Sequence, residues 1–298
     1  MFAMIGRNPR EAPMLQNTFQ HLPGVGEKTE MALWKQQIHH WKDLLKTRSR
    51  PHLKNRNLIQ ESLRESITQL QNGNARYFQE RLPAGIHWRM FPEFREKAVY
   101  LDIETDGLDP ACGSITTIAL FDGKNVSCYI QGHNMDAFVG DIMQYNLIIT
   151  YNGKCFDIPF IENYFHITID QAQIDLRYVL AGLGLKGGLK RCESALGIGR
   201  GNLTDLDGFS AVLLWGEYRR NRSRKALETL LAYNVADTVN LEKLMIMAYN
   251  RKMQTIPLPE GNPIPQPKDL ANPYQADPAI IARIKRIPSM DPSVLYRR

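Results

Sequence analysis

Four acidic side chains, spread over three segments that lie far apart in the chain, are the residues best suited to chemistry. The segments read YLDIETDGL, YNGKCFDIPF and YNVADTVNL, and they supply Asp102, Glu104, Asp157 and Asp237, with Tyr233 four positions before the last. Hard divalent cations such as Mg²⁺ prefer oxygen ligands of this kind, and such ions assist phosphoryl chemistry. The pattern therefore predicts a metal site suited to cutting phosphodiesters.

The secondary structure expected around these residues would bring them together. Asp102 and Glu104 are two positions apart on an expected strand, so both side chains leave the same face. Tyr233 and Asp237 are four positions apart on an expected helix, hence on one face and about 6 Å apart at Cβ. Asp157 follows a strand and an Asn-Gly turn, where an open α/β sheet commonly builds its site. A helix docked on the sheet would complete the cluster.

Each piece taken alone has an ordinary structural explanation. A pair such as Asp102 and Glu104 is more often a surface pair than a ligand set, and Asp157 could simply cap the helix that it begins. A tyrosine four residues before an aspartate is usually ordinary surface or core. The agreement of order, spacing and expected secondary structure across all three segments favours the metal site.

Charge is distributed unevenly along the 298 residues, although the net charge is only +6. Residues 1–95 hold 15 Lys and Arg against 8 Asp and Glu, whereas residues 96–250 hold 14 against 19. A basic segment joined to an acidic one is typical of a nucleic-acid-binding region attached to a metal-binding catalytic body, although basic faces are also often merely solvated.

The composition also predicts the compartment. No apolar run reaches the roughly 18 residues that span a bilayer, and the first thirteen residues lack the apolar stretch of a signal peptide. The four cysteines, Cys112, Cys128, Cys155 and Cys192, are scattered and form no metal-ligand pairs. We therefore expect a reduced, cytoplasmic protein without a membrane association.

The expected elements divide the chain into three parts. Residues 1–92 read as a helical region, and residues 93–250 carry short apolar strands with helices between and after them, which predicts an α/β fold around a mixed sheet. Residues 251–298 hold nine of the seventeen prolines, which predicts an extended, poorly ordered, basic tail with one short helix at 278–287. The expected strands are 98–104, 115–121, 126–131, 147–151 and 173–176. The expected helices of this domain are 157–165, 189–196, 209–219 and 223–249.

The segment LPGVGEKT, which begins at Leu22, predicts a phosphate contact in the helical region. Gly24 and Gly26 allow a tight turn whose amides lie at the start of a helix, next to Lys28. The segment resembles the helix-hairpin-helix motif of DNA-binding proteins, in which a helix would stand on each side of the turn. A purely structural turn is the alternative, and a run of lysines and arginines from Lys42 to Arg56 favours nucleic acid.

The three acidic segments resemble the motifs of the DnaQ-like 3′–5′ exonucleases, the DEDD group on a ribonuclease H-like fold. YLDIET is similar to their first motif, YNGKCFDIPF to the second, and Tyr233 to Asp237 to the tyrosine form of the third. The stretch from Asp175 through GLGLKGGLKRCESALGI to LLAYNVAD is closest to stand-alone bacterial ribonuclease H-like proteins of the YprB type. The resemblance covers about residues 95–250. Asp106 departs from it, since DIETTGL would be commoner.

The resemblance implies a two-metal mechanism with Mg²⁺ or Mn²⁺. Asp102 would bridge both ions, Glu104 and Asp237 would complete one metal site, and Asp157 would act through bound water. Tyr233 would orient the attacking water, because its usual pKa of about 10 makes it a poor base near neutrality.

The resemblance also implies residues that bind the substrate. Asn152 and Phe156 would shape the site, and Leu108 would press against the terminal base. Independently of the family, Lys190 follows two glycines and could offer a cation to a phosphate, with a glycine helix break as the alternative. Three aromatic residues are interpreted as core. A cluster of basic residues from Arg219 to Lys225 is interpreted as a solvated loop, with a contact to the bound strand as the alternative. These aromatic residues are Tyr178, Trp215 and Tyr218.

These observations lead to the hypothesis of a metal-dependent 3′–5′ exonuclease acting on single-stranded or frayed 3′ ends of DNA, with RNA as another substrate. The polarity comes from the resemblance, since the spacing alone indicates only a metal site. Two alternatives remain open: a structure-selective endonuclease on the same fold, and an inactive nucleic-acid-binding adaptor. Retention of all four carboxylates and of Tyr233 argues against the adaptor.

Overall fold

A mixed five-stranded sheet forms the centre of the protein. The computed structural model describes residues 14–47, 55–258 and 263–287. The strand order is β3-β2-β1-β4-β5, with β1 antiparallel to β2 and parallel to β4. The strands are β1 (Ala98–Thr105), β2 (Ile115–Phe121), β3 (Val126–Ile130), β4 (Leu147–Thr150) and β5 (Ala172–Asp175). All five strands agree with the sequence-based expectation within two residues.

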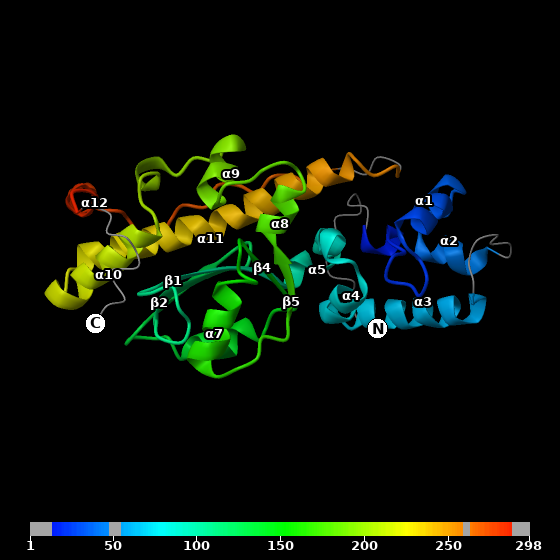
Figure 1. Ribbon diagram of the computed structural model, residues 1–298, viewed down its shortest axis with the longest axis horizontal. Coiled ribbons are helices and arrows are strands. Elements are labelled where there is room, and N and C mark those ends of the chain that lie inside the picture. Colours follow the sequence, from blue (N-terminus) through cyan, green and yellow to red (C-terminus); the bar gives the residue numbers. More distant parts are fainter. Residues whose placement is uncertain (1–13, 48–54, 259–262, 288–298) are drawn as a thin grey trace.

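Helices cover both faces of this sheet (Figure 1). On one face, Leu101 and Ile103 of β1 share a core with α6 (Ala137–Ile142) and α7 (Asp157–Phe165). On the other face, Tyr100 packs in the core that includes Leu244 of the 30-residue helix α11 (Arg224–Met253). Strand side chains alternate between faces, so this apolar pattern fixes which face of β1 meets α11. The expected α/β fold, a mixed sheet flanked by helices, is confirmed.

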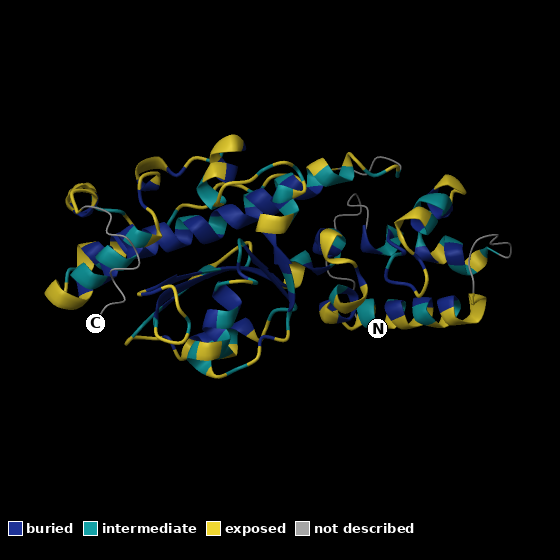
Figure 2. Ribbon diagram, in the orientation of Figure 1, coloured by how far each residue is buried: buried dark blue, intermediate teal, exposed yellow. Residues whose placement is uncertain are grey.

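The three α-helices immediately before α11 in the chain pack against it. They are α8 (Leu176–Ala181), α9 (Leu189–Ala195) and α10 (Gly208–Asn221). Asp207 and Ser210 form a capping box at the start of α10, and Ser223 caps α11 immediately after α10 ends. Arg222, which has a left-handed backbone, ends α10 directly before Ser223. Figure 2 shows that the middle of α11 is buried between these helices and the sheet.

The N-terminal region is helical, as expected, and lies beside the β5 edge of the sheet (Figure 1). Its helices are α1 (Glu27–Lys35), α2 (Trp41–Lys46), α3 (Arg56–Gln71), α4 (Ala75–Arg81) and α5 (Phe91–Phe94), with 3-10 helices at η1 (Leu15–Asn17), η2 (Ala84–Met90) and η3 (Arg95–Lys97). The rings of Trp88 and Phe91 contact Tyr249 near the end of α11. One buried cluster therefore runs from this region into the sheet.

The C-terminal segment differs from the expectation of a poorly ordered tail. Residues 263–287 are extended and then helical, and they lie along α11. The side chain of Asn272 donates to the carbonyl of Ala232 at 2.8 Å, and the Asp277 amide donates to the Thr229 hydroxyl at 3.0 Å. Helix α12 (Pro278–Lys285), with Asp277 as its cap, packs in one core with α10 and α11. Specific tertiary contacts therefore order a segment whose proline content predicted disorder.

Two predictions from composition can be compared with the structure. All four cysteines are free thiols. In the part of the chain that the structure describes, no helix is both long and apolar enough to cross a membrane.

Candidate metal centre

Strand β1 presents the first two carboxylates of the candidate site. Asp102 pairs with Ala119 and Glu104 with Thr117 in the β1–β2 ladder, so both residues lie in regular, paired strand. Their side chains leave the face that meets α11, because Leu101 and Ile103 occupy the opposite core. The sequence-based prediction that both acidic side chains share one face is consistent with this packing.

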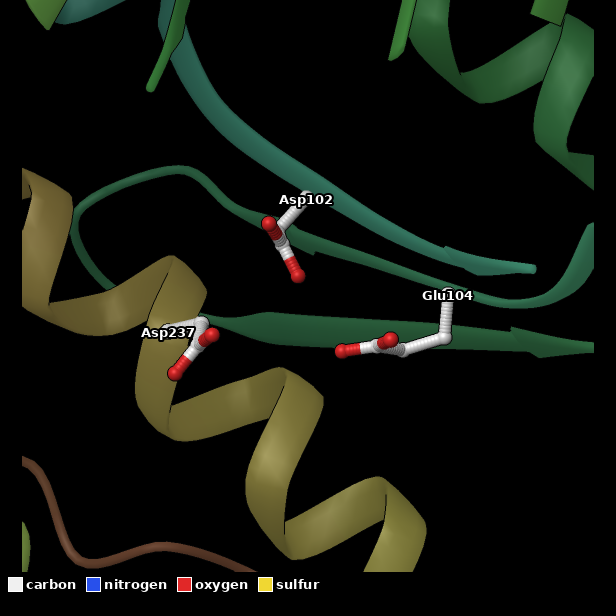
Figure 3. A group of neighbouring side chains, drawn as sticks. All are labelled: Asp102, Glu104 and Asp237. Carbon is white, nitrogen blue, oxygen red and sulfur yellow. The ribbon is translucent and has the colours of Figure 1, made fainter. Parts of the chain in front are cut away.

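Helix α11 delivers the third carboxylate across the interface with the sheet. One ligand oxygen from each of Asp102, Glu104 and Asp237 lies within 4.8 Å of the others, and Figure 3 shows these three side chains between β1 and α11. Asn234, one turn before Asp237, donates from Nδ2 to Asp102 Oδ2 at 2.7 Å and accepts from the Thr117 hydroxyl at 3.1 Å. This amide therefore ties α11 to two strands at the site.

Asp157 lies beside these three carboxylates and is held separately. It is the first residue of α7, and its Oδ1 accepts a hydrogen bond from the Ile103 amide at 3.2 Å. Strand β4 pairs with β1 only as far as Tyr100, so Ile103 lies beyond the last β4 partner. Asp157 thus occupies the place where the two parallel strands separate, and its charge raises the pKa values of Asp102 and Glu104.

Burial disfavours the ionisation of all four carboxyl groups, and repulsion from neighbouring carboxylates adds to this at Asp102 and Glu104. Burial, then repulsion from Asp237, raises the pKa of Asp102 well above its usual range, and the same two causes act on Glu104. Burial raises the pKa of Asp157 to about 7 and that of Asp237 to about 6, the latter against the opposing effect of Arg200. A cation bound between these groups would favour their ionised forms. The all-oxygen donor set fits a hard divalent ion.

A buried ion-pair network behind Asp237 was not predicted from the sequence. Arg200 donates from Nη1 to Asp237 Oδ1 and from Nε to Glu193 Oε2, while Glu193 Oε1 accepts from Asn240 Nδ2 at 2.9 Å. Arg200 Nη2 is also buried, without a hydrogen-bond partner among the described residues. Arg200 lies in the glycine-rich segment GIGRG, which matches no spacing rule, so no sequence signal connected it with Asp237.

Tyr233 lies in the same interface, one helical turn before Asp237. It is buried, and burial together with the charge of Asp237 raises the pKa of its hydroxyl far above the usual value. The ammonium of Lys190 lies 5.2 Å from the centre of its ring, and the guanidinium of Arg200 lies 6.0 Å away. Burial, and the charge of Arg200, lower the pKa of Lys190. The structure therefore brings Lys190, which follows the two glycines, to the predicted tyrosine.

Three of the predicted substrate-binding residues lie in the loops that follow β1 and β4. Leu108, in the loop after β1, is 61% exposed. Asn152 has a left-handed backbone, and its amide donates to Asp175 Oδ1 at 2.7 Å while its side-chain oxygen accepts from Arg177. Phe156 is half-buried and packs on Phe160.

Asp106, the departure from the family pattern, has a structural role. Its Oδ1 accepts a hydrogen bond from the Ser114 amide at 2.6 Å, and its own amide donates to the Ser114 carbonyl. The side chain therefore closes the loop between β1 and β2.

The N-terminal turn is at a distance from these carboxylates. Gly24 has a φ of +73°, Gly26 is the N-cap residue of α1, and Gly24, Gly26 and Lys28 are all exposed. Figure 1 places α1 at the opposite end of the long axis from α10 and α12. Among the described residues only the three-residue helix η1 precedes the turn, so the expectation of a full helix on each side is wrong there, and the helix-hairpin-helix assignment stays a prediction.

The three aromatic residues interpreted as core separate into two groups. Trp215 and Tyr218 are buried against α11, as expected. Tyr178 is 56% exposed, so its assignment to the core is wrong. It lies on the short helix α8, and its hydroxyl is 3.4 Å from the sulfur of Cys155. Four basic residues where α10 ends and α11 begins are all exposed: Arg219, Arg220, Arg222 and Arg224.

Several solved structures align with part of this chain. A family B DNA polymerase from the hyperthermophilic archaeon Pyrobaculum calidifontis aligns at 16% identity with a TM-score of 0.40, over 51% of this chain and 25% of that one. This chain therefore matches about a quarter of the polymerase's length. NrnC of Brucella melitensis with bound Mg²⁺ aligns at 19% identity with a TM-score of 0.39, over 55% of this chain and 78% of that one. A structure described as the apo form of the nuclease aligns at 20% identity with a TM-score of 0.39, over 54% and 75%.

Two comparisons of the sequence gave different results. A search among curated proteins finds no match. The model of the RNase H superfamily, in contrast, matches residues 99–249, which is just over half of the chain. That range contains all of β1 but its first residue, the turn before α7 and nearly all of α11, and so includes all four carboxylates and Tyr233. The chain, with its acidic pair on the first strand and its third carboxylate on a helix docked across it, belongs to the RNase H superfamily.

Proposed function

We propose that this protein is a metal-dependent 3′–5′ exonuclease that hydrolyses phosphodiester bonds from single-stranded or frayed 3′ ends of DNA. The observation that carries the proposal is the cluster of Asp102, Glu104 and Asp237, whose ligand oxygens lie within 4.8 Å of one another. Burying like charges lowers the stability of the fold, and strongly raised pKa values are common at catalytic sites. The exonuclease polarity rests on the motif resemblance.

The four carboxylates would hold Mg²⁺ or Mn²⁺. Asp102, Glu104 and Asp237 would bind one ion directly, and Asp157 would help to hold a second through water, since its Oδ1 already accepts from the Ile103 amide. Divalent ions in such a pair stabilise the attacking and leaving oxygens of an in-line displacement.

Tyr233 would position the attacking water through a hydrogen bond to its hydroxyl, which would stay protonated. Burial and the nearby carboxylates raise the pKa of its hydroxyl, so it cannot act as a general base at neutral pH. Lys190, near the Tyr233 ring, would contribute positive charge toward the phosphate that is being cut.

The loops around the carboxylates would hold the terminal nucleotides. Leu108 is 61% exposed and would press on the last base, while Asn152 and Phe156 lie in the loop that leads into Asp157. The Leu108 side chain carries no hydrogen-bonding group with which to read a base edge. This arrangement suits an enzyme that removes nucleotides without regard to base identity.

The turn before α1 would contact the backbone of the nucleic acid farther from the cut. Gly24 and Gly26 are exposed, and Lys28 lies in the first turn of α1, where helix amides attract phosphate. Because α1 lies at one end of the long axis, a nucleic-acid strand that reaches it from the cut would run across the N-terminal region.

Replacing Asp102 tests the catalytic proposal. We expect the wild-type protein with Mn²⁺ to shorten a 5′-labelled single strand progressively, and we expect Asp102→Asn to slow this by about a thousandfold, because it removes a ligand from the metal cluster. The Asp136→Asn variant, which changes an exposed aspartate, is the matched control and should cut at the wild-type rate. Matched DNA and RNA strands report the substrate preference.

Three results would contradict this proposal in different ways. Cleavage of a circular single strand would indicate an endonuclease. Binding without any cleavage by the wild-type protein would indicate an adaptor. Wild-type rates from Asp102→Asn protein would show that the carboxylate cluster is not the catalytic site.

The pH dependence of stability tests whether the carboxylates need a cation. Groups whose pKa is raised in the fold bind more protons folded than unfolded, so without divalent ions their contribution is lost as pH rises from about 5 to about 8. Asp102→Asn removes one repelling charge, and we expect its free energy of unfolding to fall less over this range than that of the wild type. Urea unfolding in a chelator at both pH values measures the difference.

Added Mn²⁺ provides the second arm of this experiment. The ion should stabilise the wild-type protein more at about pH 8 than at about pH 5, since it binds the ionised carboxylates, and it should stabilise Asp102→Asn less. Parallel pH curves for the two proteins, with no effect of Mn²⁺, would mean that these carboxylates do not form a cation site.

Lys28 tests the proposed contact of the N-terminal turn. In Asp102→Asn protein, which should leave the substrate intact, Lys28→Ala should reduce the slope of log affinity for single-stranded DNA against log salt by about 0.7, because one phosphate contact is lost. The exposed Lys124, in the turn between β2 and β3, gives the matched control Lys124→Ala. Equal slopes for the two variants would make the turn before α1 a packing element only.

A further inference from the structure

In the structure, three of the four carboxylates at the candidate metal centre already have one oxygen occupied by a protein donor. Asp102 Oδ2 accepts from Asn234 Nδ2 at 2.7 Å, and Asp157 Oδ1 accepts from the Ile103 amide at 3.2 Å. Asp237 Oδ1 accepts from Arg200 Nη1. Each aspartate is therefore left with one oxygen that no protein donor in these contacts occupies.

The two side-chain donors are themselves held by buried partners. Arg200 also donates to Glu193, whose other oxygen accepts from Asn240 at 2.9 Å. The side chain of Arg200 is 4% exposed and that of Glu193 is 1% exposed. Asn234 is fully buried and accepts from Thr117 through its own oxygen. Because each donor has a second fixed contact, neither can turn away from its aspartate without breaking a buried hydrogen bond.

This arrangement restricts how an ion can be bound. A cation held by both oxygens of Asp237 would lie beside the guanidinium of Arg200, and the two positive charges would repel each other. Binding through both oxygens of Asp102 would compete with the donor hydrogen of Asn234. Ca²⁺ takes six to eight oxygens and often uses both oxygens of one carboxylate, whereas Mg²⁺ requires a near-ideal octahedron with single oxygens. Manganese shares the octahedral oxygen preference.

We propose that Arg200 and Asn234 are positioning residues that select a small octahedral cation over Ca²⁺, by limiting Asp237 and Asp102 to one oxygen each. The inference rests on the metal site of the proposed function and adds the residues that determine its ion preference. Neither residue touches the ion or the substrate in this account, since both act through an aspartate. Hydrogen-bond partners of metal ligands tune metal affinity in this way.

A simpler role for Arg200, as a counter-ion that merely neutralises Asp237, makes a different prediction. Loss of a counter-ion would change the affinity for all divalent ions by the same factor, because it acts through charge alone. Asn234 is neutral, so its loss would have no such effect. The two roles are therefore separated by the ratio of affinities for two ions of equal charge.

Isothermal titration of metal-free protein with Mn²⁺ and with Ca²⁺ measures that ratio in the absence of substrate. Two variants are compared with the wild type. Arg200→Lys keeps the positive charge but loses the fork that bridges Glu193 and Asp237, and Asn234→Ala removes the donor to Asp102 without changing the charge. In each variant we expect the preference for Mn²⁺ over Ca²⁺ to fall by about tenfold, chiefly through tighter Ca²⁺ binding.

Arg89 supplies the matched control. It is a buried arginine that pairs with Glu30 at 2.8 Å in the N-terminal region, so Arg89→Lys should alter stability but leave the ion preference unchanged. Circular dichroism in chelator identifies folded variants. An unchanged Mn²⁺ to Ca²⁺ ratio in either folded variant would overturn the inference and leave the proposed function standing. Failure of the wild-type protein to bind either ion would instead contradict the proposed metal site itself.

Discussion

The burial of three like charges between β1 and α11 is the constraint on which the rest of the structure depends. Burial and the charge of Asp237 raise the pKa values of Asp102 and Glu104, and burial raises that of Asp237, so the interface that holds them cannot be stabilised by these residues themselves. The apolar contacts on either side supply the stability, with Leu241 and Leu244 of α11 almost completely buried on the sheet. Helix α11 thus both packs on the sheet and carries Asp237 to the site.

Much of this arrangement follows from local rules. The alternation along β1 predicted that Asp102 and Glu104 share a face, and the four-residue spacing predicted that Tyr233 and Asp237 share a helix face. Strand boundaries were predicted well because buried strands are short apolar runs that end at turns. The local pattern of the sequence therefore accounts for how β1 and α11 present the carboxylates.

The unpredicted features depend on contacts between distant segments. Arg200 meets Asp237 only because the loop after α9 folds back onto α11, and no periodicity links the two residues. The segment around Asn272 is ordered by its hydrogen bond to α11, although its prolines suggested disorder. Tyr178 was assigned to the core from its aromatic ring alone, while its place on the outer side of a short helix leaves it exposed. Composition cannot distinguish such cases, because burial is decided by the tertiary neighbours.

The most direct test of the central claim, that these carboxylates form a divalent cation site, is a crystal structure of the protein grown with Mn²⁺. Our account predicts a peak of anomalous scattering between Asp102, Glu104 and Asp237, with Arg200 still bound to Asp237. A well-ordered structure with no anomalous peak at these residues, or with the Mn²⁺ bound elsewhere, would contradict it.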